Sequence, residues 1–531
     1  MSTTMTAPVL SNLESHEPEH GVDNRVEESL ELRTKIANRD AHVPAPRQVD
    51  NGDERRYADK CASYTKGVKQ AAIGKVDLAA YKSFKKALES GKPEDFNQVI
   101  LGGTRTLNGP QGALAYQLEC LDNSQFVSPP APALASEAYA TELVELYWAS
   151  LLRDVAFTDY SSNSTAAMAS TELSSLPAYA GPKNGAGKVT PDLLFRGQFR
   201  GETVGPYLSQ FLLKDTTFGA LPLTQRYATY PAKKDFMLDP VSFQQVQNGQ
   251  PTGQSLLPQP IPLFLHDGRG LGAYTRVDVL YEAYFIAYLV LNSIGTPLNP
   301  GNPYIGNRTQ NGFATFGQPD IASVLVNAAS AALKAVWYQK WNVHLRHRPE
   351  SGGAIVYLSL DPTLPKVDGR LSNTVLHSKA VQTCMSVNNS ALLSQAFPEG
   401  SPTHPAYPTG HGAVAGACIT VLKFFFDGNF VVPQPKVPSN DGMSMADYTG
   451  SDAGNLTVNG ELNKLATNVS FGHGIHPGIH WRSDTESSIQ LGEAVALSLL
   501  EDLADTYNEK FSVSLQKVDG SIATISNQFR T

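Results

Sequence analysis

The pattern of apolar and polar residues along the chain predicts a mainly helical protein. From 137 to 155, apolar residues recur every three or four positions, as on one face of a helix. From 276 to 293 they lie nearly all round, which is typical of a buried helix. The other segments predicted to be helical are 81–88, 320–347, 411–426 and 484–507. In 320–347, Asp320 is a candidate N-cap and the segment ends before Pro349.

Outside these helices, the sequence predicts an arm, two long connections and a hairpin. Residues 1–50 are polar and rich in acids, so we expect an N-terminal arm that is helical around 25–38. Proline and glycine concentrate around 181–206 and 238–272, and connections this long are usually functional or interface-forming. The last residues alternate around Asp519-Gly520, which predicts a small C-terminal β-hairpin.

Composition narrows the class of protein. With 531 residues, 41% apolar and 17% charged, the chain can bury a large core. A net charge of −8 argues against a nucleic-acid partner, because the footprint for one is basic. The four cysteines have no Cys-x-x-Cys spacing, so neither a disulfide framework nor a structural zinc site is indicated. No secretory signal and no run of about 18 apolar residues is visible, so we expect a soluble, cytoplasmic protein without a membrane partner.

The first candidate site is the loop 402–411, which leads into an apolar helix. The loop brings the hydroxyl of Thr409, the N–H of Gly410 and the imidazole of His411 to the first helical turn. A helix N-terminus has free N–H groups and the positive end of the helix dipole, so it suits an anion. His404 lies seven residues before His411. Each histidine alone is also compatible with a structural hydrogen bond or a loop position.

The second candidate site is the basic segment 340–350. Lys340, His344 and Arg348 are spaced by four, so on a helix they share one face. Like charges on one face repel one another unless an anion or a carboxylate lies opposite. The alternative is a solvated basic face.

The third candidate site is 471–484, where three histidines lie within eight residues. His480 is four residues before Asp484, so a carboxylate could hold one imidazole nitrogen and present the other. A metal site with several histidine ligands is an alternative, although the spacing is not that of His-Glu-x-x-His.

The order of these segments resembles a known family. Lys-x7-Arg-Pro, then Pro-Thr-Gly-His at a helix start, then Gly-Ile-His-x3-Asp is similar to the superfamily of vanadium-dependent haloperoxidases and type 2 phosphatidic-acid phosphatases. The longer sequences around these motifs, 340–344, 400–411 and 478–484, resemble the bromoperoxidase branch of red algae and cyanobacteria. Three further segments, 51–54, 65–67 and 205–211, show the same resemblance. The resemblance implies two helical bundles with long loops and assembly into homodimers or larger homo-oligomers. In that reading the haloperoxidase-like domain is 51–531, and its active-site segments are 340–350, 402–416 and 471–484.

The resemblance also implies a role for each candidate side chain. His480 would be the metal ligand that binds vanadium, and His411 would be the acid–base group opposite it. Lys340 would polarise bound peroxide, and His404 occupies the position that is histidine in bromoperoxidases. Thr409 replaces the usual serine and keeps its hydroxyl. The implied cofactor-binding set is Lys340, Arg348, Thr409, Gly410, His473 and His480, and the implied catalytic set is His411, Lys340 and His404.

One position departs from the family. Members have a second arginine six residues before the metal-binding histidine, and here that position is Gly474. His473 takes the place of the arginine if the loop has one extra residue. A titratable imidazole is a weaker cation, and a charge-assisted contact contributes roughly 1.5–3 kcal/mol. The replacement therefore predicts an oxyanion affinity that is lower by one to two orders of magnitude.

The implied function is that of an oxidoreductase. A vanadate-dependent haloperoxidase would use hydrogen peroxide to oxidise bromide, or iodide, to hypohalous acid, which halogenates a small organic substrate. Phosphate is a near-isosteric anion and would occupy the same site as vanadate. One alternative is a phosphatase with His480 as nucleophile and His411 protonating the leaving group. The other is a degenerate homologue that binds an oxyanion weakly or not at all.

Overall fold

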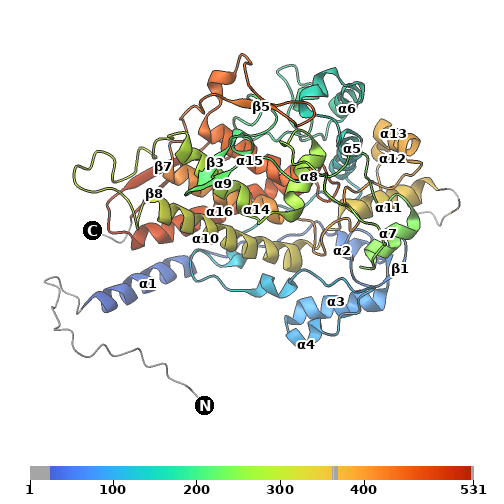
Figure 1. Ribbon diagram of the computed structural model, residues 1–531. Helices are drawn as coiled ribbons and strands as arrows, with labels where there is room; N and C mark the ends of the chain where they lie inside the picture. Colours follow the sequence, from blue (N-terminus) through green and yellow to red (C-terminus); the bar gives the residue numbers. More distant parts are fainter. Residues whose placement is uncertain (1–23, 362, 364–368, 528–531) are drawn as a thin grey trace.

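The computed structural model describes residues 24–361, 363 and 369–527 (Figure 1). The described part is mainly helical and contains four short two-stranded antiparallel sheets. The mainly α-helical fold predicted from the sequence is therefore confirmed.

The helices are α1 (Arg25–Ala41), α2 (Asp53–Arg56), α3 (Leu78–Ser90), α4 (Pro93–Phe96), α5 (Glu137–Leu152), α6 (Ser164–Ser175), α7 (Pro240–Gln247), α8 (Gly268–Val277), α9 (Glu282–Ser293), α10 (Gln318–Tyr338), α11 (Pro349–Leu360), α12 (Asn373–Leu376), α13 (Lys379–Asn388), α14 (Gly410–Phe425), α15 (Val458–His473) and α16 (Arg482–Thr506). The strands are β1 (Gln70–Ala72), β2 (Lys75–Val76), β3 (Thr216–Phe218), β4 (Leu221–Leu223), β5 (Lys436–Pro438), β6 (Met445–Asp447), β7 (Ser512–Gln516) and β8 (Ile522–Ser526). The last two strands form the predicted hairpin.

The two largest apolar clusters among the described residues hold most of the long helices together. One is built from α9, α10, α14, α15 and α16 with the C-terminal hairpin, and the other from α5, α6, α11 and α13. In Figure 1 the first group fills the centre and left of the molecule, and the second lies at the right. The segments that carry the candidate site run between these two groups.

Glycines allow α14 and α16 to pack unusually closely. A Cβ on Gly492 would lie 1.9 Å from the carbonyl oxygen of Ala413, and one on Gly416 would lie 1.9 Å from that of Ile489. Backbone atoms cannot yield at such distances, so only glycine permits this approach. The contact also aligns the two helix starts, because the N–H of Thr409 donates to the carbonyl oxygen of Asp484 at 3.1 Å.

Helix α10 is an apolar core helix. Among the residues that the structure describes, the helical run Gln318–His344 is the one segment long and apolar enough to cross a membrane. It packs against α14 and α16 in the first core. This packing accounts for its apolar composition.

The predicted helix 320–347 differs from the structure at both ends. α10 begins at Gln318 with Gly317 at the N-cap, so Asp320 is not the N-cap residue. Instead, its carboxylate accepts the N–H of Phe316 at 2.7 Å from within the first turn. After Tyr338 the chain widens into a π-helix, Gln339–His344, which ends at Leu345 with φ +44°.

Two other regions were predicted incompletely. The helix expected over 276–293 is broken between α8 and α9, and Asp278 lies at the break. The connection expected over 238–272 contains α7 and the start of α8.

Helix α15 was not predicted, because its sequence is rich in asparagine, glycine, threonine and serine, which have low helix propensity. Every residue of α15 is buried, so tertiary packing overrides that propensity.

The N-terminal arm is described from residue 24 onward; residues 1–23 lie outside the described part. The predicted helix is α1, which has no buried residue and lies along the lower edge of the molecule in Figure 1. Arg39 ties it to α16 through Asp505 at 2.9 Å and through Asp502.

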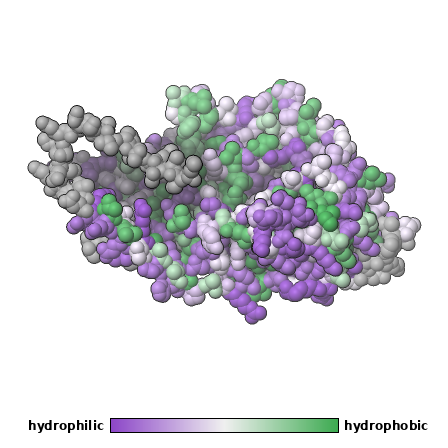
Figure 2. All heavy atoms as spheres, turned by 90° about the horizontal axis from the view of Figure 1, so that it is seen from below, coloured by the Kyte–Doolittle hydropathy of each residue, from purple (hydrophilic) through white to green (hydrophobic). Residues whose placement is uncertain are grey.

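Figure 2 shows the molecule from below, where hydrophilic residues cover much of the surface and hydrophobic ones are scattered in small groups.

We predict that Gly492→Ala destabilises the protein by at least about 1–3 kcal/mol, because the new methyl group overlaps the backbone of α14. Chemical denaturation measures the change. Gly454→Ala is the matched control, since a Cβ there meets nothing within 4 Å, and its effect should stay within about 0.5 kcal/mol. Equal stabilities for the two variants would contradict the proposed role of the glycine contact.

Candidate active site

The three segments singled out in the sequence meet in one buried cluster, centred on Arg348. Nη1 of Arg348 lies 2.7 Å from Nε2 of His480, and its Nη2 lies 3.0 Å from Nδ1 of His404. Its Nε donates to the carbonyl oxygen of His404 at 2.9 Å. The arginine therefore joins residues 56 and 132 positions away in the sequence.

Lys340 supplies the second cation of the cluster. It lies on the π-helix, and its Nζ donates to the carbonyl oxygens of Pro405 and Ala406 at 2.8 Å each. Burial, and then the charge of Arg348, lower the pKa of Lys340 well below its usual value. Among the described residues, neither Lys340 nor Arg348 forms an ion pair with a carboxylate within 4.0 Å. The cluster therefore has positive charge that an anion would balance.

His480 is oriented by Asp484. Its Nδ1 lies 2.8 Å from Oδ2 of Asp484, whose other oxygen accepts Nη1 of Arg346 at 2.7 Å. Because the carboxylate holds the proton on Nδ1, Nε2 carries the free electron pair, and it faces Arg348. A nitrogen in this state can bind a metal centre.

The start of α14 presents groups that suit an oxyanion. Thr409 is at the N-cap, and its hydroxyl is buried without a hydrogen-bond partner in the described part of the chain. The first helical hydrogen bond runs from the N–H of Ala413 to the carbonyl of Thr409, so the N–H groups of Gly410 and His411 precede it. An unpartnered hydroxyl, helix-start N–H groups and two cations fit vanadate or phosphate.

His411 lies at the edge of this cluster, between a carboxylate and a second imidazole. Its Nε2 is 3.1 Å from both carboxylate oxygens of Asp278. Its ring stacks on that of His473, with centroids 3.7 Å apart and planes at 19°. Asp278 was not predicted from the sequence, because a single carboxylate inside a predicted helix gives no signal of a partner 133 residues away.

The structure explains why Gly474 carries no side chain. A Cβ there would lie 2.9 Å from Cβ of His480 and 2.9 Å from the carbonyl oxygen of Ser470. His473 instead reaches the cluster, and its ring centroid is 5.4 Å from that of His480. Burial, and then the charge of His411, lower the pKa of His473 well below its usual value. This direction is that of a weaker cation than arginine, as the sequence suggested.

Three other histidines of these segments lie away from the cluster, and one of them, His347, contacts the hydroxyl of Tyr139 at 3.0 Å. His344 packs edge-on against Tyr407, so the single stripe expected from residues 340, 344 and 348 does not form. The π-helix and the left-handed residue that follows it separate these positions. His476 hydrogen-bonds to the hydroxyl of Tyr207 at 3.0 Å.

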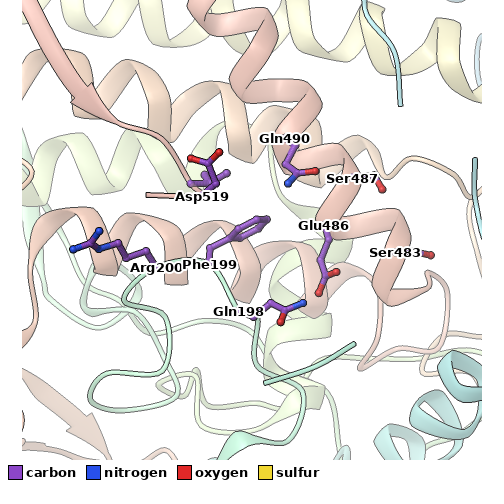
Figure 3. Close-up of a pocket in the computed structure, with 9 residues that line it drawn as sticks. Gln198, Phe199, Arg200, Ser483, Glu486, Ser487, Gln490 and Asp519 are labelled. Atoms are coloured by element: carbon purple, nitrogen blue, oxygen red, sulfur yellow. The ribbon is translucent and has the colours of Figure 1, made fainter. Parts of the chain in front are cut away.

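A cavity of ≈ 570 Å³ lies along the first turns of α16 (Figure 3). Ser483, Glu486 and Gln490 line it from α16. The hydroxyl of Ser483 accepts Nη1 of Arg346 at 2.9 Å, the same nitrogen that contacts Asp484. One arginine therefore links the carboxylate behind His480 to a cavity near the surface.

Fold and site together define a class: a helical-bundle enzyme with a buried oxyanion pocket. Residues 320–509 match the family described as the second helical-bundle domain of VCPO. The chain is 30% identical to a vanadium-dependent bromoperoxidase of Corallina officinalis, over 96% of this chain and 100% of that one. It is 31% identical to one of Ascophyllum nodosum, over 90% and 87%. The chain therefore belongs to the vanadium-dependent haloperoxidases, which are oxidoreductases.

A solved structure supports the same assignment over the whole fold. The homohexameric second vanadate-dependent bromoperoxidase of Ascophyllum nodosum superimposes with a TM-score of 0.92 and is 27% identical. The match covers 99% of this chain and 95% of that one.

Three buried histidines outside the oxyanion cluster predict acid-labile folding. Burial lowers the pKa to about 4 for His344 and to about 3 for His347 and His476. In the unfolded chain these rings take up protons near pH ~6.5, so unfolding binds protons below that pH. Above about pH 6.5 these rings do not lower the free energy of unfolding. Below that pH the free energy of unfolding falls, by up to about 1.4 kcal/mol per pH unit for each ring.

Urea unfolding at about pH 7, 6 and 5 measures this dependence. The variant His476→Gln should show a smaller loss between the same pH values, because it removes one of the three rings. An unfolding free energy that stays constant from pH 7 to pH 5 would contradict the prediction.

Proposed function

We propose that this chain is a vanadate-dependent haloperoxidase that oxidises bromide, and iodide, with hydrogen peroxide to hypohalous acid. The names of its relatives support this activity, and the phosphatase alternative has no such support. The observation that carries the proposal is the pair of buried cations, Lys340 and Arg348, which have no carboxylate partner within 4.0 Å among the described residues; Arg348 contacts Nε2 of His480. The product would halogenate a small organic substrate.

In this proposal His480 is the metal ligand, and the groups around it hold the oxygens of vanadate. Bound vanadate supplies a Lewis-acidic centre at which hydrogen peroxide becomes an oxidant for halide. Asp484 keeps Nε2 of His480 unprotonated for this role. The residues that would hold the oxygens are Lys340, Arg348, Thr409, Gly410 and His473. Phosphate would compete for the same site.

The chain's own groups would move the proton and shape the entry for halide. Asp278 holds one ring nitrogen of His411. The other ring nitrogen is then free to accept a proton from peroxide and to return it later. Lys340 is fixed by two carbonyl oxygens and can polarise peroxide without changing position. His404 lies against Trp337, with ring centroids 4.8 Å apart, so one side of the pocket is aromatic.

We also propose homo-oligomeric assembly and a cytoplasmic location. The first is supported by the homohexameric relative. The second is supported by the four cysteines, which are free and buried, as in a reducing compartment. The division into an arm, 1–50, and a haloperoxidase-like domain, 51–531, is part of the same proposal.

We predict that purified protein brominates a β-diketone in the presence of peroxide and bromide, and that vanadate raises this rate while excess phosphate suppresses it. His480→Ala should abolish the activity, because it removes the nitrogen that Asp484 orients for the metal. Absence of bromination at saturating vanadate would refute the proposal. Turnover of p-nitrophenyl phosphate that His480→Ala abolishes would support the phosphatase alternative instead.

We predict that His473→Arg binds vanadate about one to two orders of magnitude more tightly than the wild type, because it adds a charged donor. Equilibrium dialysis measures the affinity without relying on activity. His473→Gln is the matched neutral control and should stay close to the wild type. If His473→Arg binds no more tightly than His473→Gln, the missing arginine does not limit the affinity.

A further inference from the structure

Lys66 is a buried lysine with no place in the site described so far. It is 2% exposed, and its Nζ lies 2.8 Å from Oε1 of Glu350. The same nitrogen donates to the carbonyl oxygens of Glu399 at 2.8 Å and of Ser401 at 2.6 Å. Its hydrogen bonds therefore join α11 to the loop that leads to His404.

Glu350 is as completely enclosed as its partner. Its Oε2 accepts the N–H of Ser401 at 2.8 Å, and its Oε1 accepts Nε2 of Gln247 at 2.8 Å. Burial alone would raise the pKa of Glu350, but the charge of Lys66 and its hydrogen bonds hold the pKa below the usual range. The carboxylate is thus charged, and Lys66 is the cation that balances it.

The loop residues Gly400 and Ser401 pack directly against this ion pair. Gly400 has φ +60°, and a Cβ there would lie 2.6 Å from Oε2 of Glu350 and 3.1 Å from Nζ of Lys66. Ser401, the next residue, is three positions before His404, and Glu350 is two positions after Arg348. The ion pair therefore fixes the two segments on which Arg348 and His404 meet.

Two cations lie near enough to respond if Lys66 were absent: Arg105, whose Nη1 donates to the carbonyl oxygen of Glu399 at 3.2 Å, and Arg348, on which the charge of Glu350 acts. The charge of Glu350 acts on Arg348 and raises the pKa of its guanidinium, which burial lowers to about 10. A buried carboxylate without a partner costs several kcal/mol, so it draws in a nearby cation. Arg348 is committed to His480 and His404, so a shift toward Glu350 would disturb those contacts.

We propose that Lys66 is a positioning residue that neutralises Glu350 and so keeps Arg348 directed at His480 and at the bound oxyanion. This role rests on the proposed function. Lys66 itself touches neither His480 nor the oxyanion pocket. Its charge acts through Glu350, so this part of its effect depends on the charge at position 350, whereas its bonds to the carbonyl oxygens of Glu399 and Ser401 hold the loop.

The test compares Lys66→Met, Glu350→Gln and the double variant by equilibrium dialysis with vanadate and, separately, with inorganic phosphate. Lys66→Met should weaken binding of both anions by about tenfold or more, because Arg348 is diverted. The double variant should recover to within about threefold of the wild type, since glutamine keeps hydrogen-bonding groups without the charge. Lys60→Met is the matched control, because it breaks the Lys60–Glu54 pair nearby, and it should leave binding unchanged.

The outcomes separate the inference from the function on which it rests. Wild-type protein that binds phosphate but not vanadate would refute the proposed function, and the phosphate series would still test Lys66. Unchanged binding by Lys66→Met would overturn the positioning role. A double variant that binds as poorly as Lys66→Met, or that fails to fold, would also overturn it, because the defect would then come from lost packing and not from the charge of Glu350.

Discussion

The carboxylate of Asp484 is the interaction on which the site depends. It accepts Arg346 on one oxygen, and His480 and the N–H of Trp481 on the other. The backbone carbonyl of the same residue accepts the N–H of Thr409. One residue at the start of α16 therefore holds the end of the basic segment, His480 and the start of α14 in a fixed relation. Every one of these groups is buried, so none can be satisfied by solvent instead.

The charge balance of the pocket follows from how its cations are partnered. Arg346 is matched by Asp484 and Glu142, whereas Lys340 and Arg348 contact carbonyl oxygens and imidazoles. Carbonyl oxygens fix the direction of a cation but do not cancel its charge. The fold therefore holds two charges in a place that favours an anion, and their positions are set before the anion arrives. Preorganisation of this kind is how an enzyme stabilises charge that develops during reaction.

Much of this arrangement could be predicted from the sequence, and there are physical reasons why the rest could not. Helices with a clear apolar period, such as α5 and α16, and the hairpin around Asp519-Gly520 were predicted correctly. Helix α15 was not, because its polar and small residues become helical only when packed on all sides. The family motifs predicted that the segments of Lys340, Arg348 and His480 form one site. No local sequence pattern predicts the contact of Asp278 with His411 or the Lys66–Glu350 pair. Those contacts join residues more than a hundred positions apart.

The π-helix at Gln339–His344 has a consequence for how this segment can vary. Its closing hydrogen bond runs from the N–H of Leu345 to the carbonyl of Lys340, a span of five residues where an α-helix spans four. Removing one residue would restore ordinary α-helical winding and rotate everything that follows by about 100°. Arg346 and Arg348 would then no longer point to Asp484 and His480. In this stretch the number of residues is as strict a requirement as their chemistry, so the loss of one residue would misplace the site as surely as the loss of a cation.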